Sequence, residues 1–242
     1  MPPETPLDDA EIAKFDAQAA DWWNPYGMFK PLHRFNPVRL AHIRRHACRH
    51  FGRDDDTRTP FTGLKLLDIG CGGGLLCEPM ARLGASVVGI DAGAANINVA
   101  AAHARRSNLD IDYRATTPDK LDETFDIILN MEVIEHTAAP EVFMQQCADR
   151  LATGGLMFLA TLNRTRKSFL FAIVGAEYVL RWLPRGTHDW HRFVTPAEMT
   201  AYAEQAGLAM QSTTGVSYNP LSGAWVESGD LSVNYIATAT KP

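Results

Sequence analysis

The chain has 242 residues, of which 46% are hydrophobic and 21% charged, with a formal net charge of −5 and a pI near 5.9. This length and composition suit one globular α/β domain with additions. The acidic balance argues against a nucleic-acid partner, because neutralising phosphate groups requires a basic surface. The four cysteines lack metal-ligand spacing and the first residues carry no basic-then-apolar leader, so we expect an intracellular protein with reduced thiols.

The first part of the chain, residues 1–62, is expected to form an N-terminal extension that ends in a polar linker. Its stretch 21–40 carries two tryptophans, three prolines and further aromatic residues, which predicts an irregular segment held on the core. We expect Trp22 and Trp23 to pack this segment against the core rather than to bind a ligand. A helix is expected over 40–51.

A glycine-rich turn follows the linker. A short apolar strand over 64–69 leads into four glycines within five residues and then into a helical stretch over 75–83; the glycines are Gly70, Gly72, Gly73 and Gly74. Such a turn lets backbone pass close to a ligand and points helix N-terminal amides at it. Asp91 follows Gly70 by 21 positions at the end of a second strand, where a carboxylate can accept both hydroxyls of a ribose. The pattern predicts a nucleoside-binding site.

The chain after the glycine turn alternates between strands and helices. Five strand–helix repeats predict a doubly wound α/β fold with a mostly parallel sheet, to which a terminal antiparallel pair adds the sixth and seventh strands. The remaining strands are expected over 86–90, 112–115, 125–131, 155–161, 208–216 and 233–240, and the helices over 94–106, 140–151 and 195–206. The last helix begins with a capping box, in which Thr195 is the N-cap and Glu198 the reciprocal partner.

Several polar or special residues come directly after predicted strands. Because the carboxyl ends of parallel strands meet at one edge of a sheet, we expect these residues to line that edge: Gly70, Asp91, Thr116, Met131 and Asn163. Met131 either covers the face of an adenine or is a core methionine.

The segment after the fourth strand carries Glu132, Glu135 and His136. If it is helical, these residues share one face and can converge on a divalent metal or deprotonate a substrate hydroxyl. The alternative is a helix N-terminus with acids placed for the helix dipole and His136 as a cap. The position at the expected functional edge favours the functional interpretation.

An apolar stretch at 165–187 interrupts the domain after the fifth repeat. It is too short and too charged to span a bilayer, which needs about 20 apolar residues. It is either a lid helix on the core or an interfacial helix that lies among lipid headgroups. His188, which follows it, is a candidate base or substrate contact, together with Asp189 and His191.

The pattern Asp68-x-Gly70-x-Gly72-Gly73-Gly74 resembles the glycine motif of class I methyltransferases that use S-adenosylmethionine. Further stretches, in the expected order from about Phe15 to the C-terminus, resemble the ubiquinone-biosynthesis O-methyltransferase family: Trp22–Gly27, Leu32–Arg39, Met131–His136, Thr161–Arg164, Val174–Tyr178, Gly186–Asp189 and Val233–Tyr235.

The resemblance implies a Rossmann-like methyltransferase domain over 63–242, with 165–187 as a lid or membrane-contact insertion. It implies transfer of a methyl group from S-adenosylmethionine to catechol-type hydroxyls of polyprenylated ubiquinone precursors, in both O-methylation steps. The cofactor residues are then expected to be Arg39, Gly70, Gly72, Asp91 and Met131. Arg39 is a fixed cation that can pair with the methionine carboxylate of the cofactor.

Catalytic roles are expected for Glu135, His136 and His188. The resemblance also implies that Mg²⁺ or another divalent cation can bind at Glu132, Glu135 and His136, because some family members need a metal. A membrane-borne tail favours membrane contact through Phe169–Leu183. The expected location is therefore the cytoplasm, peripherally on the inner membrane, with other ubiquinone-biosynthesis enzymes as potential partners.

Three other functions are alternatives to this one. Another small-molecule methyltransferase would turn over a catechol without a tail equally well. A non-catalytic scaffold that binds S-adenosylmethionine within a quinone-synthesis complex would have no reason to keep the candidate bases. An NAD-dependent dehydrogenase is disfavoured, because the dinucleotide fingerprint needs a third glycine at position 75, which is leucine.

Overall fold

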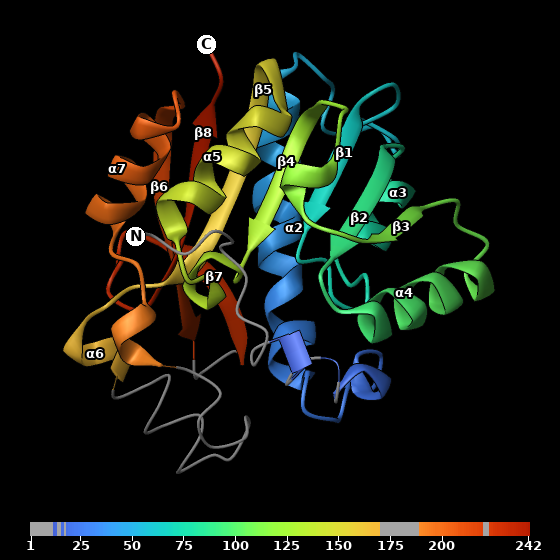
Figure 1. Ribbon diagram of the computed structural model, residues 1–242, viewed down its shortest axis with the longest axis horizontal. Helices are drawn as coiled ribbons and strands as arrows, with labels where there is room; N and C mark the ends of the chain where they lie inside the picture. The colour runs from blue at the N-terminus through green and yellow to red at the C-terminus, as the bar shows by residue number, and fades with distance from the viewer. Residues whose placement is uncertain (1–11, 14–15, 17, 170–188, 220–222) are drawn as a thin grey trace.

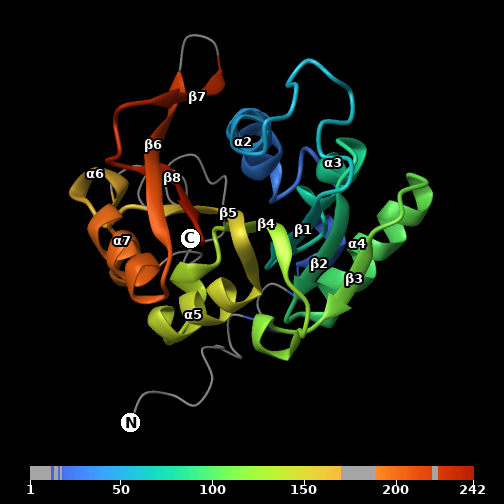
Figure 2. The same cartoon turned by 90° about the horizontal axis from the view of Figure 1, so that it is seen from above.

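The computed structural model describes residues 12–13, 16, 18–169, 189–219 and 223–242. They form three layers, in which one eight-stranded sheet has helices on both faces (Figures 1 and 2). The order of the strands is β3-β2-β1-β4-β5-β8-β6-β7. The first five strands in this order run parallel to one another, and β8, β6 and β7 are each antiparallel to their neighbours. Their bounds are β1 Lys65–Ile69, β2 Ser86–Asp91, β3 Asp112–Ala115, β4 Phe125–Met131, β5 Leu151–Leu162, β6 Ala209–Asn219, β7 Ala224–Ser228 and β8 Asn234–Thr240.

The helices cover the sheet because alternate residues of each central strand point to opposite faces. Leu66 and Ile127 belong to one apolar cluster with side chains of α2 and α3, whereas Leu67 and Ile128 belong to another with side chains of α5 and α7. The α-helices are α2 Lys30–His50, α3 Cys77–Arg82, α4 Ala94–Arg106, α5 Pro140–Arg150, α6 Arg166–Ser168 and α7 Pro196–Gln205, and the 3-10 helices are η1 Ala19–Asp21, η2 Pro118–Lys120, η3 Ile134–His136 and η5 Trp190–Arg192.

The predicted boundaries are confirmed for most of the central elements. The expected bounds of α4, β3 and β4 agree with the structure, and the capping box at the start of α7 is present. The strand predicted over 155–161 is longer, because β5 begins at Leu151 and pairs with β4 through an irregular register near Phe125. Among the described residues, no helix is both long and apolar enough to cross a membrane.

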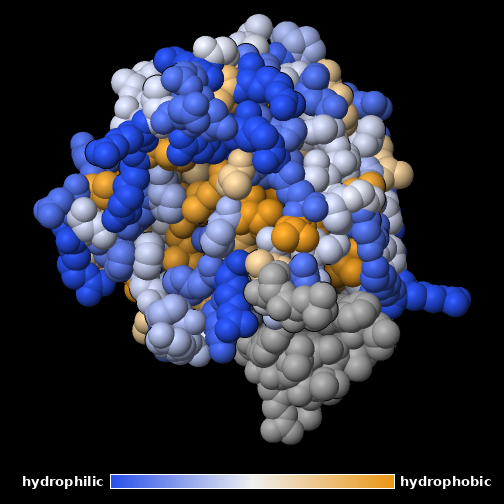
Figure 3. Space-filling view, turned by 180° about the vertical axis from the view of Figure 1, so that it is seen from behind, coloured by the Kyte–Doolittle hydropathy of each residue, from blue (hydrophilic) through white to orange (hydrophobic). Residues whose placement is uncertain are grey.

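Helix α2 corrects the prediction of an irregular segment over 21–40. The helix begins at Lys30 and contains Pro37, which has no N–H to donate to the carbonyl of His33. Burial of Phe35 and Ile43 against the sheet outweighs this loss, because tertiary packing supplies most of the stability of a helix. Seen from behind, the molecular surface shows a patch of apolar side chains among mostly hydrophilic ones (Figure 3).

Strand β7 corrects the predicted seven-stranded sheet, because it lies in the stretch between the strands expected over 208–216 and 233–240, where no strand was predicted. It pairs with the extended end of β6 and lies against α2. The ring of Trp225 packs 4.9 Å from that of Phe35. The Glu227 carboxylate binds His42 Nδ1 at 2.8 Å and Arg45 at 2.5 Å. These contacts join residues more than 180 positions apart, so local sequence patterns carry no signal of them.

Candidate functional site

The carboxyl ends of the parallel strands bring the predicted residues to one edge of the sheet. Ile69, at the end of β1, pairs with Ile90 of β2 and Asn130 of β4, so that these strands end level with one another. The expected alignment is therefore confirmed for the residues at or just after the five strand ends: Gly70, Asp91, Thr116, Met131 and Asn163. Met131 itself is buried in the core cluster on the α2 side.

The loop after β1 adopts a conformation that requires glycine. Gly70 has φ +68°, and a Cβ there would lie 2.5 Å from Cγ2 of Val133. Gly72 has φ +53°, and a Cβ there would lie 2.3 Å from Cζ2 of Trp22. Both the left-handed backbone and the close contacts exclude a larger residue. The absence of side chains on these glycines consequently lets Val133 and Trp22 pack directly on the backbone of the loop.

Asp91 ties this loop to the second strand. Its Oδ2 accepts a hydrogen bond from the backbone N–H of Gly72 at 2.9 Å. Its Oδ1 accepts from the N–H of Gly93 at 2.8 Å and from Nδ2 of Asn96 at 3.1 Å. Burial raises the pKa of Asp91, and these three donors act in the opposite direction. The carboxylate is therefore oriented before any ligand arrives, and the described residues leave one acceptor position of Oδ2 open.

The N-terminal extension contributes residues that the sequence did not assign to the site. The segment with η1 and the start of α2 lies beside the edge where β1, β2 and β4 end (Figure 1). Trp22 packs there as expected, with its ring stacked 3.8 Å from that of Phe29. Its Nε1 also donates to Oδ1 of Asn96 at 2.8 Å, and Asn96 in turn holds Asp91. In the sequence, only the position of Asn96 in the first helical turn after Asp91 could have indicated this role.

Arg39 reaches the same edge from α2. The side chain is 4% exposed, and its Nη2 donates to Oε1 of Glu132 at 2.6 Å. The guanidinium also lies 4.1 Å above the ring of Phe35. Its Nε is buried and has no hydrogen-bond partner within the described part of the chain. The guanidinium of Arg39 therefore has one N–H donor without an acceptor among the described residues.

Glu132, Glu135 and His136 do not share a helical face. Glu132 has φ +60°, and only the three-residue helix η3 follows it. Glu135 is 3% exposed, and neither carboxyl oxygen has a hydrogen-bond partner among the described residues. Burial, together with the charge of Glu132, holds the pKa of Glu135 well above its usual range. Burial therefore disfavours the charged carboxylate form of Glu135.

Comparison with known proteins gives the site its context. The chain is 58% identical over 241 residues to a ubiquinone biosynthesis O-methyltransferase of Chelativorans sp. (strain BNC1), covering 98% of this chain and 95% of the relative. It is also 58% identical over 238 residues to the enzyme of that name from Parvibaculum lavamentivorans, covering 97% and 94%. The chain belongs to the ubiquinone biosynthesis O-methyltransferase family.

The fold of this methyltransferase agrees with that assignment. A family model described as a methyltransferase domain matches residues 25–213. A magnesium protoporphyrin IX methyltransferase from Synechocystis PCC 6803, solved with bound SAH, has a TM-score of 0.65 at 16% identity and covers 97% of this chain and 100% of that one. At 16% identity this similarity shows the fold alone, which is the class I methyltransferase fold.

The side chains of this methyltransferase do not match a divalent-metal site at the predicted position. Across the described ranges, no group of three or more His, Cys, Asp or Glu side chains is placed to hold a metal ion. Glu132 is engaged by Arg39, and burial disfavours the charged form of Glu135 that a cation would need as a ligand.

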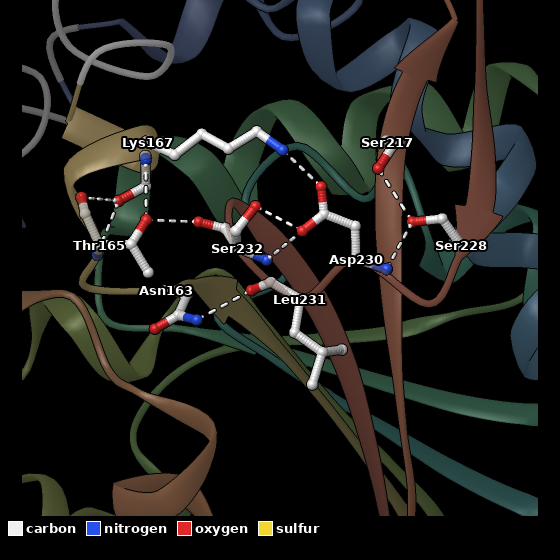
Figure 4. Close-up of polar contacts among 9 residues, drawn as sticks. Asn163, Thr165, Lys167, Ser217, Ser228, Asp230, Leu231 and Ser232 are labelled. Atoms are coloured by element: carbon white, nitrogen blue, oxygen red, sulfur yellow. Dashed lines mark hydrogen bonds and ion pairs between the residues drawn. The ribbon is translucent and has the colours of Figure 1, made fainter.

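His188 and most of the apolar insertion of this methyltransferase lie outside the described residues, but both flanks of the insertion are described. Trp190 Nε1 donates to the carbonyl of Thr165 at 2.9 Å, which brings the two flanks together. Asn163 Nδ2 donates to the carbonyl of Leu231 at 2.8 Å, and Lys167 pairs with Asp230 (Figure 4). Both described flanks of the insertion are thus held at the sheet edge that carries the candidate site.

Proposed function

We propose that the protein transfers the methyl group of S-adenosylmethionine to catechol-type hydroxyls of polyprenylated precursors in ubiquinone biosynthesis, in both O-methylation steps. The observation that carries this proposal is the 58% identity, over almost the whole of both chains, to relatives named for that pathway. The alignment of the glycine loop and Asp91 at the carboxyl edge supports it.

The cofactor is assigned to the edge formed by β1, β2 and β4. Gly70 and Gly72 let the amino-acid end of the cofactor approach the backbone, and Asp91 accepts the ribose hydroxyls. The unmatched Nε of Arg39 donates to the methionine carboxylate, which would offset the burial of this guanidinium. Met131 is assigned to the adenine side.

The chemistry requires alignment and removal of one proton. The phenol oxygen attacks the methyl carbon in line with the sulfonium sulfur, and the carbon–sulfur bond breaks to leave neutral S-adenosylhomocysteine. The hydroxyl proton passes to a base, for which Glu135 and His136 are the candidates within the described chain. A carboxyl group whose pKa is raised by burial is better matched to this transfer near neutral pH than an ordinary glutamate.

The apolar tail of the substrate suggests contact with a membrane. We assign this contact to Phe169–Leu183 and place the protein peripherally on the cytoplasmic side of the inner membrane, near other enzymes of the pathway. Phe169, at the described end of this stretch, is 46% exposed, which supports an apolar surface there. Charged substitutions at Phe171 and Trp182 are expected to abolish liposome binding without changing cofactor affinity.

The test of the reaction uses purified protein, S-adenosylmethionine and a short-tailed demethylated ubiquinol under reducing conditions, followed by mass spectrometry. A product heavier by one methyl group on oxygen is expected. No product, despite measured cofactor binding and an added membrane surface, would refute the proposed acceptor. A parallel reaction with a chelator tests the metal: loss of product that Mg²⁺ restores would assign a metal role to Glu132, Glu135 and His136.

A further inference from the structure

Trp23 contacts the glycine loop, although it belongs to the N-terminal extension and is not one of the residues at the strand ends. Its indole Nε1 donates to the carbonyl oxygen of Gly73 at 2.8 Å. Its ring stacks on the imidazole of His103, with centroids 3.4 Å apart and planes 4° from parallel. A side chain of the N-terminal extension therefore connects the loop after β1 to helix α4.

His103 is itself held in place by a buried carboxylate. Its Nδ1 lies 2.5 Å from Oε1 of Glu78, so Nδ1 carries the proton that a carboxylate accepts. The side chain of Glu78 is 2% exposed, and its other carboxyl oxygen pairs with Arg82 at 3.2 Å. A buried carboxylate is costly without its hydrogen bonds, so Glu78 fixes the orientation of His103. The imidazole in turn fixes the plane of Trp23.

The glycine loop benefits from such a constraint, because glycine has more backbone freedom than any other residue. Gly72 is held through its N–H by Asp91, and the N–H of Gly74 donates to the carbonyl of Cys71 at 2.9 Å. The carbonyl of Gly73, between them, is held by Trp23. A loop that is ordered before binding avoids that part of the entropy cost when the ligand binds.

We propose that Trp23, braced by His103 and Glu78, is a positioning residue for the cofactor of this methyltransferase. It holds the Gly73 carbonyl so that the loop has its binding conformation before the cofactor arrives. The inference rests on the proposed cofactor site at Gly70 and Gly72. It gives Trp23 a role in cofactor affinity beyond packing of the N-terminal extension.

The test is Trp23→Phe, which keeps an aromatic ring over His103 and removes the N–H. Calorimetric titration with S-adenosylhomocysteine is expected to give a Kd about three- to tenfold higher, the effect of one lost hydrogen bond. The KM for S-adenosylmethionine should rise in parallel, while kcat at saturating cofactor stays within about twofold. The matched control is Trp190→Phe, which removes the indole donor to Thr165 and should leave the Kd within about twofold of wild type.

A second variant, His103→Ala, removes the brace without touching the loop. It should also raise the Kd, and the double variant with Trp23→Phe should show less than the sum of the two effects, because both act on the same carbonyl. An unchanged Kd in Trp23→Phe, an equal rise in Trp190→Phe, or additive effects would overturn the inference. These titrations need no acceptor substrate. A wild-type protein that binds the cofactor and yields no O-methylated product would therefore count against the proposed function alone.

Discussion

Asp68 and Glu135 are carboxyl groups that the fold buries almost completely at 2% and 3% exposure, close to the proposed cofactor site. The thiol of Cys77 donates to Oδ2 of Asp68 at 3.1 Å, which is a weak compensation for lost water. Burial raises the pKa of Asp68 from 3.8 to about 7, and that of Glu135 well above its usual range. Burial therefore favours the neutral form of both carboxyl groups over the charged form. This preference affects the pH dependence of stability and the transfer of the substrate proton.

For stability, Asp68→Asn tests the cost of ionising a buried carboxyl group. Between pH 4 and 7 the folded protein keeps a proton on Asp68 that the unfolded chain has released, so the free energy of unfolding falls as the pH rises through this window. In Asp68→Asn the free energy of unfolding should fall less steeply with pH, by about 1.4 kcal/mol per pH unit. The check is urea unfolding at several pH values in the window. The exposed Asp122→Asn controls for the loss of one charge, and the same slope in wild type and Asp68→Asn would contradict the prediction.

For catalysis, Glu135→Gln tests the carboxyl group assigned to proton transfer. Glutamine cannot accept the hydroxyl proton, so kcat should fall by about 10²- to 10⁴-fold, while the Kd for S-adenosylhomocysteine stays within about twofold. Because glutamine also avoids a buried charge, the variant should unfold at a higher temperature than wild type at alkaline pH. Steady-state kinetics and thermal unfolding measure both, with the exposed Glu204→Gln as the control. Activity close to wild type would leave His136 as the base among the described candidates.

At the scale of elements, helix ends and strand ends decide where the side chains of the site point. The N-cap of α7 is a reciprocal pair, in which Oγ1 of Thr195 accepts from the N–H of Glu198 and Oε2 of Glu198 accepts from the N–H of Thr195 at 2.8 Å. Glu198 also pairs with Arg164, which directly precedes the insertion. The cap therefore ties the start of α7 to the end of β5.

Thr195→Ala removes the first half of that cap. The free energy of unfolding should fall by about 1 kcal/mol, with the slope of the denaturant transition unchanged. Thr195→Ser keeps the hydroxyl and should restore most of the loss. Equal stability of the alanine and serine variants would show that the hydroxyl does not support the helix.

At the scale of the whole molecule, the proposed cofactor site joins parts of the chain that are distant in sequence. Asp91 is linked through Asn96 to Trp22, and Trp23 reaches Gly73 across 50 positions. Arg39 of α2 binds Glu132 across 93 positions. A ligand bound among these residues interacts with the folded state alone, so its binding energy adds to the stability of the fold.

Cofactor binding should therefore raise the stability of the whole chain. S-adenosylhomocysteine at about 100 times its Kd should add about 2.7 kcal/mol to the free energy of unfolding. Thermal unfolding at increasing ligand concentration measures the effect. NAD at the same concentration is the control, since the loop lacks the third glycine of a dinucleotide fingerprint. A shift with NAD equal to that with S-adenosylhomocysteine would contradict the assignment.

Much of the fold follows from local patterns. Apolar runs, the glycine turn and the capping box predict most of the central elements and place Gly70, Asp91 and Met131 at one edge, because strand periodicity and turn chemistry act over a few residues. The same patterns misjudged α2 and omitted β7. In both places the deciding contacts, such as those of Phe35 with Trp225, come from remote parts of the chain.

By itself, the sequence determined the fold class, the family resemblance and the edge of the sheet where the site lies. Only the tertiary structure decided that Glu135 is buried and its pKa raised, that Arg39 holds Glu132, and that Trp23 holds the glycine loop. The physical reason is that burial and long-range hydrogen bonds depend on which surfaces come together. A residue's neighbours along the chain specify its backbone conformation far better than the dielectric surroundings and partners of its side chain.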